Sequence, residues 1–212
     1  MSPSPRYAIC RSCAGRNNRV SRAGNRREET LVYLVDNLSP YPRCAMTENK
    51  NRNLLNLARA RLVTHQAGQV RTCLEALNEG QLWWRANEES NTIGNLVLHL
   101  CGSTRFYIGH GVGNSGYRRN RDAEFAEQGP IAKEALQAHF DSAMAEADRV
   151  LVAFDAERID DTTDRTGKPT TYTELILNQL LHFTAHTGQI VFATKLIQAG
   201  VIHEVWKTTP LE

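Results

Sequence analysis

The sequence predicts an all-α protein: a bundle of four helices in which a long crossover joins the second helix to the third. Apolar residues recur at steps of three and four in four separate segments, which is the period of an amphipathic helix. Capping residues precede these segments and turn-rich stretches separate them. No alternating run of apolar and polar residues bounded by turns indicates a strand. The chain has 212 residues, of which 41% are hydrophobic, and this is enough for one core.

The first two helices are predicted on either side of a connection that contains two tryptophans. Helix one should span about residues 51–77, where a broad apolar face recurs at helical spacing. Ser90 and Asn91 are suitable N-caps for helix two. We expect this helix to continue through Tyr107 and to end in the glycine-rich residues 109–116.

The last two helices are predicted after a polar connection over residues 109–129, which forms the long crossover. Pro130 suits the first turn of helix three, because a backbone N–H is not needed there. A turn-rich loop follows helix three. Thr171 and Glu174 then form a capping box for helix four, which Gly200 ends.

Residues 1–45 differ in composition from residues 46–212. Eight arginines and three acidic residues give the first segment a formal charge of +5, whereas 17 basic and 20 acidic residues give the second −3. Residues 1–29 show no apolar periodicity, so they lack the apolar surface that offsets the entropy of ordering. We therefore expect residues 1–45 to be a disordered or non-native extension, with natural translation starting at Met46, and residues 46–212 to be the bundle domain.

Charge and cysteine usage exclude several classes of protein. The negative charge of residues 46–212 gives no electrostatic attraction for nucleic acid. No segment approaches the ~20 apolar residues of a membrane-spanning helix. The Cys10-Arg-Ser-Cys13 motif lacks the second pair that a zinc site needs, so we interpret it as chance, with a metal or redox role as the alternative. Without a secretory signal, we expect a cytoplasmic protein in which Cys73 and Cys101 are small buried hydrophobes.

Two histidines one helical turn apart are the most informative feature of the sequence. His182 and His186 lie on the predicted inward face of helix four. Burying imidazoles without partners is costly, so this pair needs hydrogen-bonded neighbours or a metal ion. His99, on the core-facing side of helix two, is the candidate third ligand. We expect structural or surface roles for the other four histidines: His65, His110, His139 and His203.

Three segments resemble the DinB/YfiT-like superfamily of small bacterial proteins. They are residues 91–100, 121–125 and 182–190, and the resemblance covers about residues 50–200. The order of the three segments is more specific than any one of them. The sequence most resembles the branch that has a long arginine-rich connection after helix two.

This resemblance implies a DinB-like four-helix bundle, often dimeric, with a three-histidine site for a divalent metal ion. The first ligand comes from helix two, and an H-x-x-x-H motif on the last helix supplies the other two. By position, these metal ligands are His99, His182 and His186. We accordingly expect a homodimer formed through bundle helices; a wide apolar face on helix one is a further reason.

Three neutral imidazoles suit Zn²⁺ or Ni²⁺, and also Fe²⁺. They leave at least one position open, where the ion can lower the pKa of a bound water or thiol toward neutrality. The superfamily that the sequence resembles includes thiol-dependent S-transferases and isomerases, so the resemblance implies chemistry of this kind. We expect a metal-dependent thiol transferase or hydrolase that acts on a small-molecule substrate or a low-molecular-weight thiol. The alternative is a non-catalytic, metal-binding stress-response protein with a structural metal.

The sequence assigns no general base. Three amides near the ligands either orient them, contact substrate or make ordinary core hydrogen bonds: Asn95, Gln179 and Gln189. Three arginines of the crossover are candidates for binding an anionic substrate at the rim: Arg118, Arg119 and Arg121. The alternative for these arginines is a solvated loop in which they pair with Asp122 and Glu124.

Overall fold

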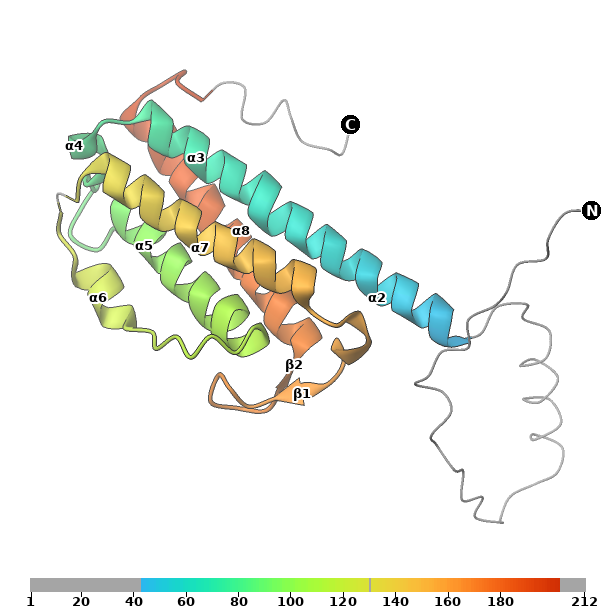
Figure 1. Ribbon diagram of the computed structural model, residues 1–212. Helices are drawn as coiled ribbons and strands as arrows, with labels where there is room; N and C mark the ends of the chain where they lie inside the picture. Colours follow the sequence, from blue (N-terminus) through green and yellow to red (C-terminus); the bar gives the residue numbers. More distant parts are fainter. Residues whose placement is uncertain (1–42, 130, 203–212) are drawn as a thin grey trace, which may run out of the picture. The chain divides into compact units, whose positions relative to one another are not determined.

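The computed structural model describes residues 43–129 and 131–202, in which four long helical segments form one bundle (Figure 1). This arrangement confirms the predicted all-α class. A one-turn helix, α4 (Glu79–Leu82), lies in the connection between the first two segments. Among the described residues, no helix combines the length and the apolar character needed to cross a membrane. Residues 1–42, with Cys10 and Cys13, lie outside the described part, so the separate N-terminal extension stays a prediction.

Helix one consists of α2 (Arg43–Arg59), the π-helical segment η2 (Ala60–Gln66) and α3 (Ala67–Ala76). Its buried apolar residues follow one face at helical spacing, except that Leu62 and Ala67 are five positions apart. The π-helical turn absorbs the additional residue, because its hydrogen bonds join residues five positions apart. The buried stripe therefore stays on one side of a helix that the sequence predicted as regular.

Helix two begins later than predicted, with α5 (Ile93–Thr104). The N-cap is Thr92, whose hydroxyl accepts a hydrogen bond from the backbone N–H of Asn95 at 3.0 Å. The assignment of Ser90 and Asn91 as caps was therefore wrong by one or two positions. Ser90 instead donates its hydroxyl to a neighbouring asparagine in the preceding turn.

Helix two also ends later than predicted, after the π-helical segment η3 (Arg105–Val112). The expectation that its glycines break the helix is wrong, because Gly109 and Gly111 are buried inside it. A Cβ at Gly109 would collide with the carboxylate of Glu146, and one at Gly111 would lie 3.2 Å from Leu175. These glycines let helix two approach helices three and four closely.

The crossover from helix two to helix three carries a short helix that sequence reasoning missed, α6 (Arg121–Ala126), which packs against α5 (Figure 1). Asn95 fixes this contact by donating hydrogen bonds to the backbone carbonyls of Glu124 (3.0 Å) and Glu127 (2.7 Å). Gly102 allows the close approach, because a Cβ at that position would collide with the Glu124 carboxylate. The long crossover is confirmed, and its second half is bound to helix two.

Helix three is α7 (Lys133–Ala153), followed by the single turn η4 (Ala156–Arg158). Pro130, predicted for its first turn, lies outside the described residues. The predicted apolar stripe of this helix is confirmed by the residues that it buries: Leu136, Phe140, Ala143, Met144, Ala147 and Leu151.

Helix four is α8 (Tyr172–Ile197), and the predicted capping box is present. The Thr171 side chain accepts from the backbone N–H of Glu174, whose carboxylate accepts from the backbone N–H of Thr171. Two-residue strands before this helix, β1 (Thr162–Thr163) and β2 (Thr170–Thr171), pair antiparallel. Sequence reasoning missed this pairing, because two residues are too few to show an alternating pattern.

Candidate metal centre

Three histidine side chains from helices two and four meet at one site. His99 Nε2 lies 2.9 Å from His182 Nε2, and His186 Nε2 lies 3.1 Å from the same atom. The potential ligand atoms of all three lie within 4.8 Å of one another. The structure thus brings together the three residues that the sequence predicted as ligands.

Local geometry explains this meeting. Residues four apart lie one turn apart on the same face of α8, which places His182 beside His186. A buried contact joins α8 to α5, where Gln179 Nε2 donates to Thr104 Oγ1 at 2.9 Å. His99 on α5 is only 4% exposed, whereas the two histidines of α8 are half-buried. The site is therefore anchored in the core on one side and accessible on the other.

A buried carboxylate from α6 completes the hydrogen bonding of His99. Glu124 Oε2 lies 2.9 Å from His99 Nδ1. Arg119 holds this carboxylate with two hydrogen bonds, from Nε to Oε1 at 2.8 Å and from Nη2 to Oε2 at 2.7 Å. Burial alone raises the pKa of Glu124, but hydrogen bonds from Arg119 and His99, with their charges, outweigh it and lower the pKa below its ordinary value. Glu124 is therefore an ionised acceptor beside His99 Nδ1, and Arg119 Nη2 lies 3.0 Å from the same nitrogen.

The role of Glu124 was missed by sequence reasoning. A solvated pairing with arginine is wrong for this residue, because Glu124 is 8% exposed and its pair with Arg119 is buried. The available signal was a carboxylate inside residues 121–125, a segment that already carried the resemblance. Arg118 is exposed, as expected of a solvated loop.

His186 has a comparable partner on its own helix. Gln189 Oε1 lies 2.7 Å from His186 Nδ1, one helical turn along α8. An amide oxygen can only accept, so Nδ1 of His186 carries the proton and Nε2 carries the lone pair. Gln189 thus makes the orienting contact that was one of its predicted roles.

The donor set fits a divalent metal ion. In the tautomers in which Nδ1–H of His99 donates to Glu124 and Nδ1–H of His186 donates to Gln189, each residue directs an Nε2 lone pair toward His182. A neutral His182 offers at most one Nε2–H and can satisfy only one of them, whereas a cation accepts all three lone pairs. Zn–N bonds of about 2.0–2.1 Å place two nitrogens of a tetrahedral site about 3.3 Å apart. Two of the three observed separations, 2.9 and 3.1 Å, are close to that value, and all three ligand atoms lie within 4.8 Å of one another.

The two imidazoles of α8 are held in the neutral form that binds metals. Burial, followed by the charges of His186, His99 and Arg119, lowers the pKa of His182 to about 4. Burial also lowers the pKa of His186, although its hydrogen bond with Gln189 opposes the shift. Near pH 7, protons therefore do not compete with a metal ion for these two residues.

Two buried polar atoms beside the ligands have no hydrogen-bond partner: Nδ1 of His182 and Oε1 of Gln179. Such atoms are rare in folded proteins, and these two belong to residues one turn apart on α8. Glu124 and Gln189 each face the Nδ1 of a ligand with an oxygen. We expect Gln179 Oε1 to accept from Nδ1–H of His182 once Nε2 of that histidine binds a cation.

The ligands border a cavity of about 440 Å³. Tyr107, Phe125 and Arg121 contribute to its wall, and the Arg121 guanidinium lies 5.0 Å from the centre of the Phe125 ring. Within the described residues, His65, His110 and His139 are not part of the cluster, whereas His203 lies outside the described part.

The chain matches one family model over residues 49–208, described as "Protein of unknown function (DUF1572)". The chain belongs to this family. The match covers all three clustered histidines and Glu124. No significant match to this DUF1572 protein is found among curated proteins or solved structures.

Replacing His99, His182 or His186 with alanine should remove most of the bound metal, because two imidazoles form a poor site. Elemental analysis of the purified variants measures this loss. His65→Ala and His139→Ala are matched controls and should keep the metal. Gln179→Leu should weaken metal affinity about 10–100-fold, as loss of a partner of a ligand does. Equal metal content in the wild type and all three ligand variants would contradict the site.

Proposed function

We propose that this DUF1572 protein is a metal-dependent enzyme that activates a thiol or a water molecule at a divalent cation held by His99, His182 and His186. The observation that carries the proposal is the convergence of three imidazole nitrogens beside an open cavity. The described residues add no fourth Cys, His, Asp or Glu to this cluster. Structural zinc sites are closed by four protein ligands, whereas catalytic sites keep one position open.

A bound divalent cation lowers the pKa of a water or thiol at its open position toward neutrality. The protein's own contribution is to hold the imidazoles in the correct tautomer and orientation. Glu124 does this for His99, and Gln189 does it for His186. Arg119 keeps Glu124 ionised by two short hydrogen bonds. These contacts place the donor nitrogens before any substrate enters.

Neither of the two cysteines that the structure describes, Cys73 and Cys101, offers a reactive thiol. Burial raises the pKa of the Cys101 thiol to about 12 and also raises the pKa of Cys73. Both thiols are buried, and neither is a thiolate near neutral pH. We therefore propose a low-molecular-weight thiol as co-substrate and the cytoplasm as the location, because thiols stay reduced there.

Arg121 favours an anionic small-molecule substrate. Arg119 is committed to the buried carboxylate of Glu124, whereas Arg121 is exposed, lines the cavity and forms no ion pair within the described residues. Its guanidinium lies over the Phe125 ring, and this contact restricts the directions in which its N–H groups can donate. A substrate carboxylate or phosphate could pair with Arg121 while its reacting end faces the histidines.

The donor set favours Zn²⁺ or Ni²⁺ and also accommodates Fe²⁺, because all three readily bind neutral imidazoles. The placement of the family within the DinB/YfiT-like superfamily of bacterial proteins is part of the same proposal. It is supported by the helical bundle and by one ligand on helix two with two on helix four.

The second candidate is a non-catalytic, metal-binding stress-response protein. It is favoured by the positions of the ligands, since His99 and His182 are 83 residues apart and a metal joining them would tie α5 to α8. The two functions differ in whether the metal has an exchangeable position and in whether the fold requires the metal.

Cobalt substitution should reveal an exchangeable position. We expect 2-mercaptoethanol to add a thiolate-to-cobalt absorption band to the Co²⁺-loaded protein, with ethylene glycol as the control that lacks the sulfur. An unchanged spectrum would reject the thiol branch of the proposal. A spectrum that azide also leaves unchanged would reject the open position, and with it the enzyme.

Metal removal should lower stability without unfolding the bundle, because an apolar core on all four helices is already buried without the metal. A metal present at about 100 times its Kd stabilises by about 2.7 kcal/mol. Far-UV circular dichroism after chelation should therefore show retained helicity and a cooperative melt, with Tm lowered by roughly 5–10 °C. Collapse of helicity would instead support the structural metal.

The homodimer is proposed to form through α8 rather than through helix one. From residue 50 onward, where the structure describes its side chains, helix one buries most of its wide apolar face within the bundle and leaves Leu57 as its exposed large hydrophobic residue. On α8, four large apolar side chains are exposed at steps of four, eleven and four, which is one face of a helix: Leu177, Leu181, Phe192 and Leu196.

Light scattering at micromolar concentration should report a dimer for the wild type. Leu181→Glu and Phe192→Glu should give monomers, because each would bury a charge in the interface. Val152→Glu is the matched control, since Val152 is equally apolar and 55% exposed but lies on α7. A monomeric wild type would contradict the proposal.

A further inference from the structure

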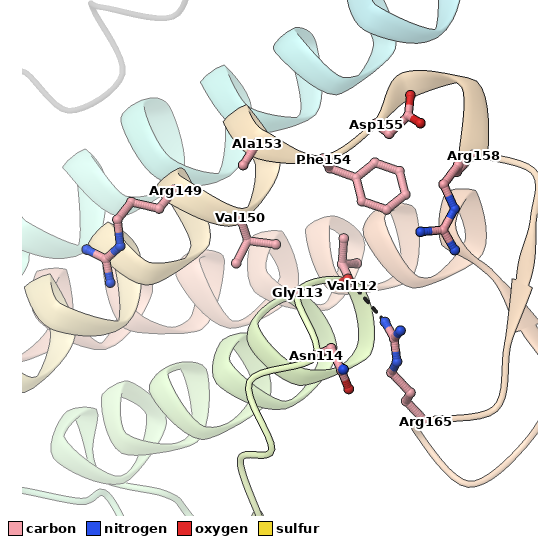
Figure 2. Close-up of a pocket in the computed structure, with 10 residues that line it drawn as sticks. All are labelled: Val112, Gly113, Asn114, Arg149, Val150, Ala153, Phe154, Asp155, Arg158 and Arg165. Carbon is pink, nitrogen blue, oxygen red and sulfur yellow. Dashed lines mark hydrogen bonds between the residues drawn. The ribbon is translucent and has the colours of Figure 1, made fainter. Parts of the chain in front are cut away.

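A second cavity, of about 480 Å³, lies where the end of η3 meets the end of α7 and the β1–β2 loop (Figure 2). It shares no lining residue with the histidine cavity. Val112, Val150 and Phe154 form an apolar surface in the middle of the view, and Arg149 and Arg158 lie on opposite sides of it. The cavity therefore combines an apolar floor with cationic edges.

Arg165 is held in position at this cavity by hydrogen bonds to two backbone carbonyl groups and a tyrosine hydroxyl. Its Nη1 donates to the carbonyl oxygens of Gly111 (3.2 Å) and Val112 (3.3 Å), and it lies 3.4 Å from the Tyr172 hydroxyl. All of these contacts use one nitrogen. Within the described residues, no hydrogen bond uses Nε or Nη2 of Arg165, so the fixed guanidinium keeps donors for another group.

The other charged groups at the cavity leave it positive. Arg158 is partly committed, since its Nε donates to Asp161 at 3.1 Å and its guanidinium lies over the Tyr172 ring. Arg149 is exposed and forms no ion pair within the described residues. Asp155 is the acidic residue of the lining, and its carboxylate already caps η4 by accepting from a backbone N–H. Three arginines and one aspartate give the lining a formal charge of +2.

This positive charge contrasts with the rest of the domain. Residues 46–212 carry a formal charge of −3, whereas the residues that line this cavity carry +2. Guanidinium groups bind carboxylates and phosphates through paired N–H donors, and fixed guanidinium groups lose less entropy in doing so. A cavity of a few hundred Å³ with apolar walls and a few placed polar groups is typical of small-molecule sites.

We propose that this cavity binds a small organic anion, whose apolar body packs on Val150 and Phe154 and whose carboxylate or phosphate pairs with the fixed guanidinium of Arg165, while Arg149 adds positive charge at the opposite edge. The two anionic groups share the chemistry that the arginines recognise. The apolar floor distinguishes such a ligand from an inorganic ion, because it rewards the burial of a hydrocarbon body. The site is separate from the histidine cluster and does not depend on the enzyme proposal.

Isothermal titration of the full-length, metal-loaded protein tests this site with five probes: phenyl phosphate, benzoate, hexanoate, inorganic phosphate and benzyl alcohol. At least one organic anion should bind at submillimolar Kd and bind at least tenfold more tightly than inorganic phosphate and benzyl alcohol. Preference for phenyl phosphate would identify a phosphate ligand, and preference for benzoate or hexanoate a carboxylate ligand. Raising the salt concentration should weaken binding.

Variants locate the binding. Arg165→Ala should weaken it at least tenfold, because it removes the paired N–H donors. Arg149→Ala should weaken it less, about threefold, because Arg149 acts from the opposite edge by its charge alone. Arg149, being exposed and unpaired among the described residues, can be replaced without disturbing the fold. Arg85→Ala, at an exposed arginine outside both cavities, is the matched control and should leave the affinity unchanged. Arg121→Ala, at the histidine cavity, should also leave it unchanged.

Three results would overturn the proposal: no organic anion binding at about 5 mM, equal affinity for benzyl alcohol, or loss of binding in Arg121→Ala but not in Arg165→Ala. The last result would place the anion at the histidine cavity. None of them bears on metal content, so failure of this site and failure of the metal centre are distinguishable.

Discussion

The ion pair between the buried Glu124 and Arg119 is the interaction on which the geometry of the three-histidine cluster depends. An unpaired carboxylate inside a protein costs several kcal/mol, and here two hydrogen bonds from one guanidinium offset that cost. The pair holds a negative charge against His99 Nδ1 at 2.9 Å. An ionised carboxylate at this position favours the His99 tautomer that carries Nδ1–H, and this tautomer directs its Nε2 lone pair toward the two histidines of α8. Without the arginine, burial would favour a protonated Glu124. Its O–H would then donate to His99 Nδ1 and favour the opposite tautomer.

The fold and the meeting of His182 with His186 could be predicted because they follow from local spacing. Apolar steps of three and four identify the helices, and two histidines four apart share one side of a helix wherever the helix packs. The prediction that this pair faces inward was only partly right, since both residues are half-buried at the edge of the buried face of α8. His99 required more, since spacing alone did not place helix two beside helix four. The resemblance supplied that placement, and the structure brings the three nitrogens together.

What escaped prediction depends on contacts between distant elements. The helix α6 is too short to show a period, and it is positioned by Asn95 from α5 rather than by its own sequence. In the sequence, Gly109 and Gly111 resemble helix breakers. Their role appears only with the neighbouring helices, which leave little room for a side chain at either position. The same holds for Arg165, whose role at the second cavity arises from carbonyl groups more than 50 residues earlier in the chain.

The absence of a side chain at Gly102 on α5 makes room for the side chain of Glu124 on α6. A Cβ at position 102 and the carboxylate of Glu124 would occupy the same space, so a larger residue there must displace this carboxylate from its contacts with Arg119 and His99. A relative that keeps a glutamate against its first histidine is confined to glycine one turn further along helix two. A relative that acquires alanine or serine there must shorten or lose the carboxylate. Paired substitution at these positions would therefore mark the branches of the family that orient their first histidine by another group.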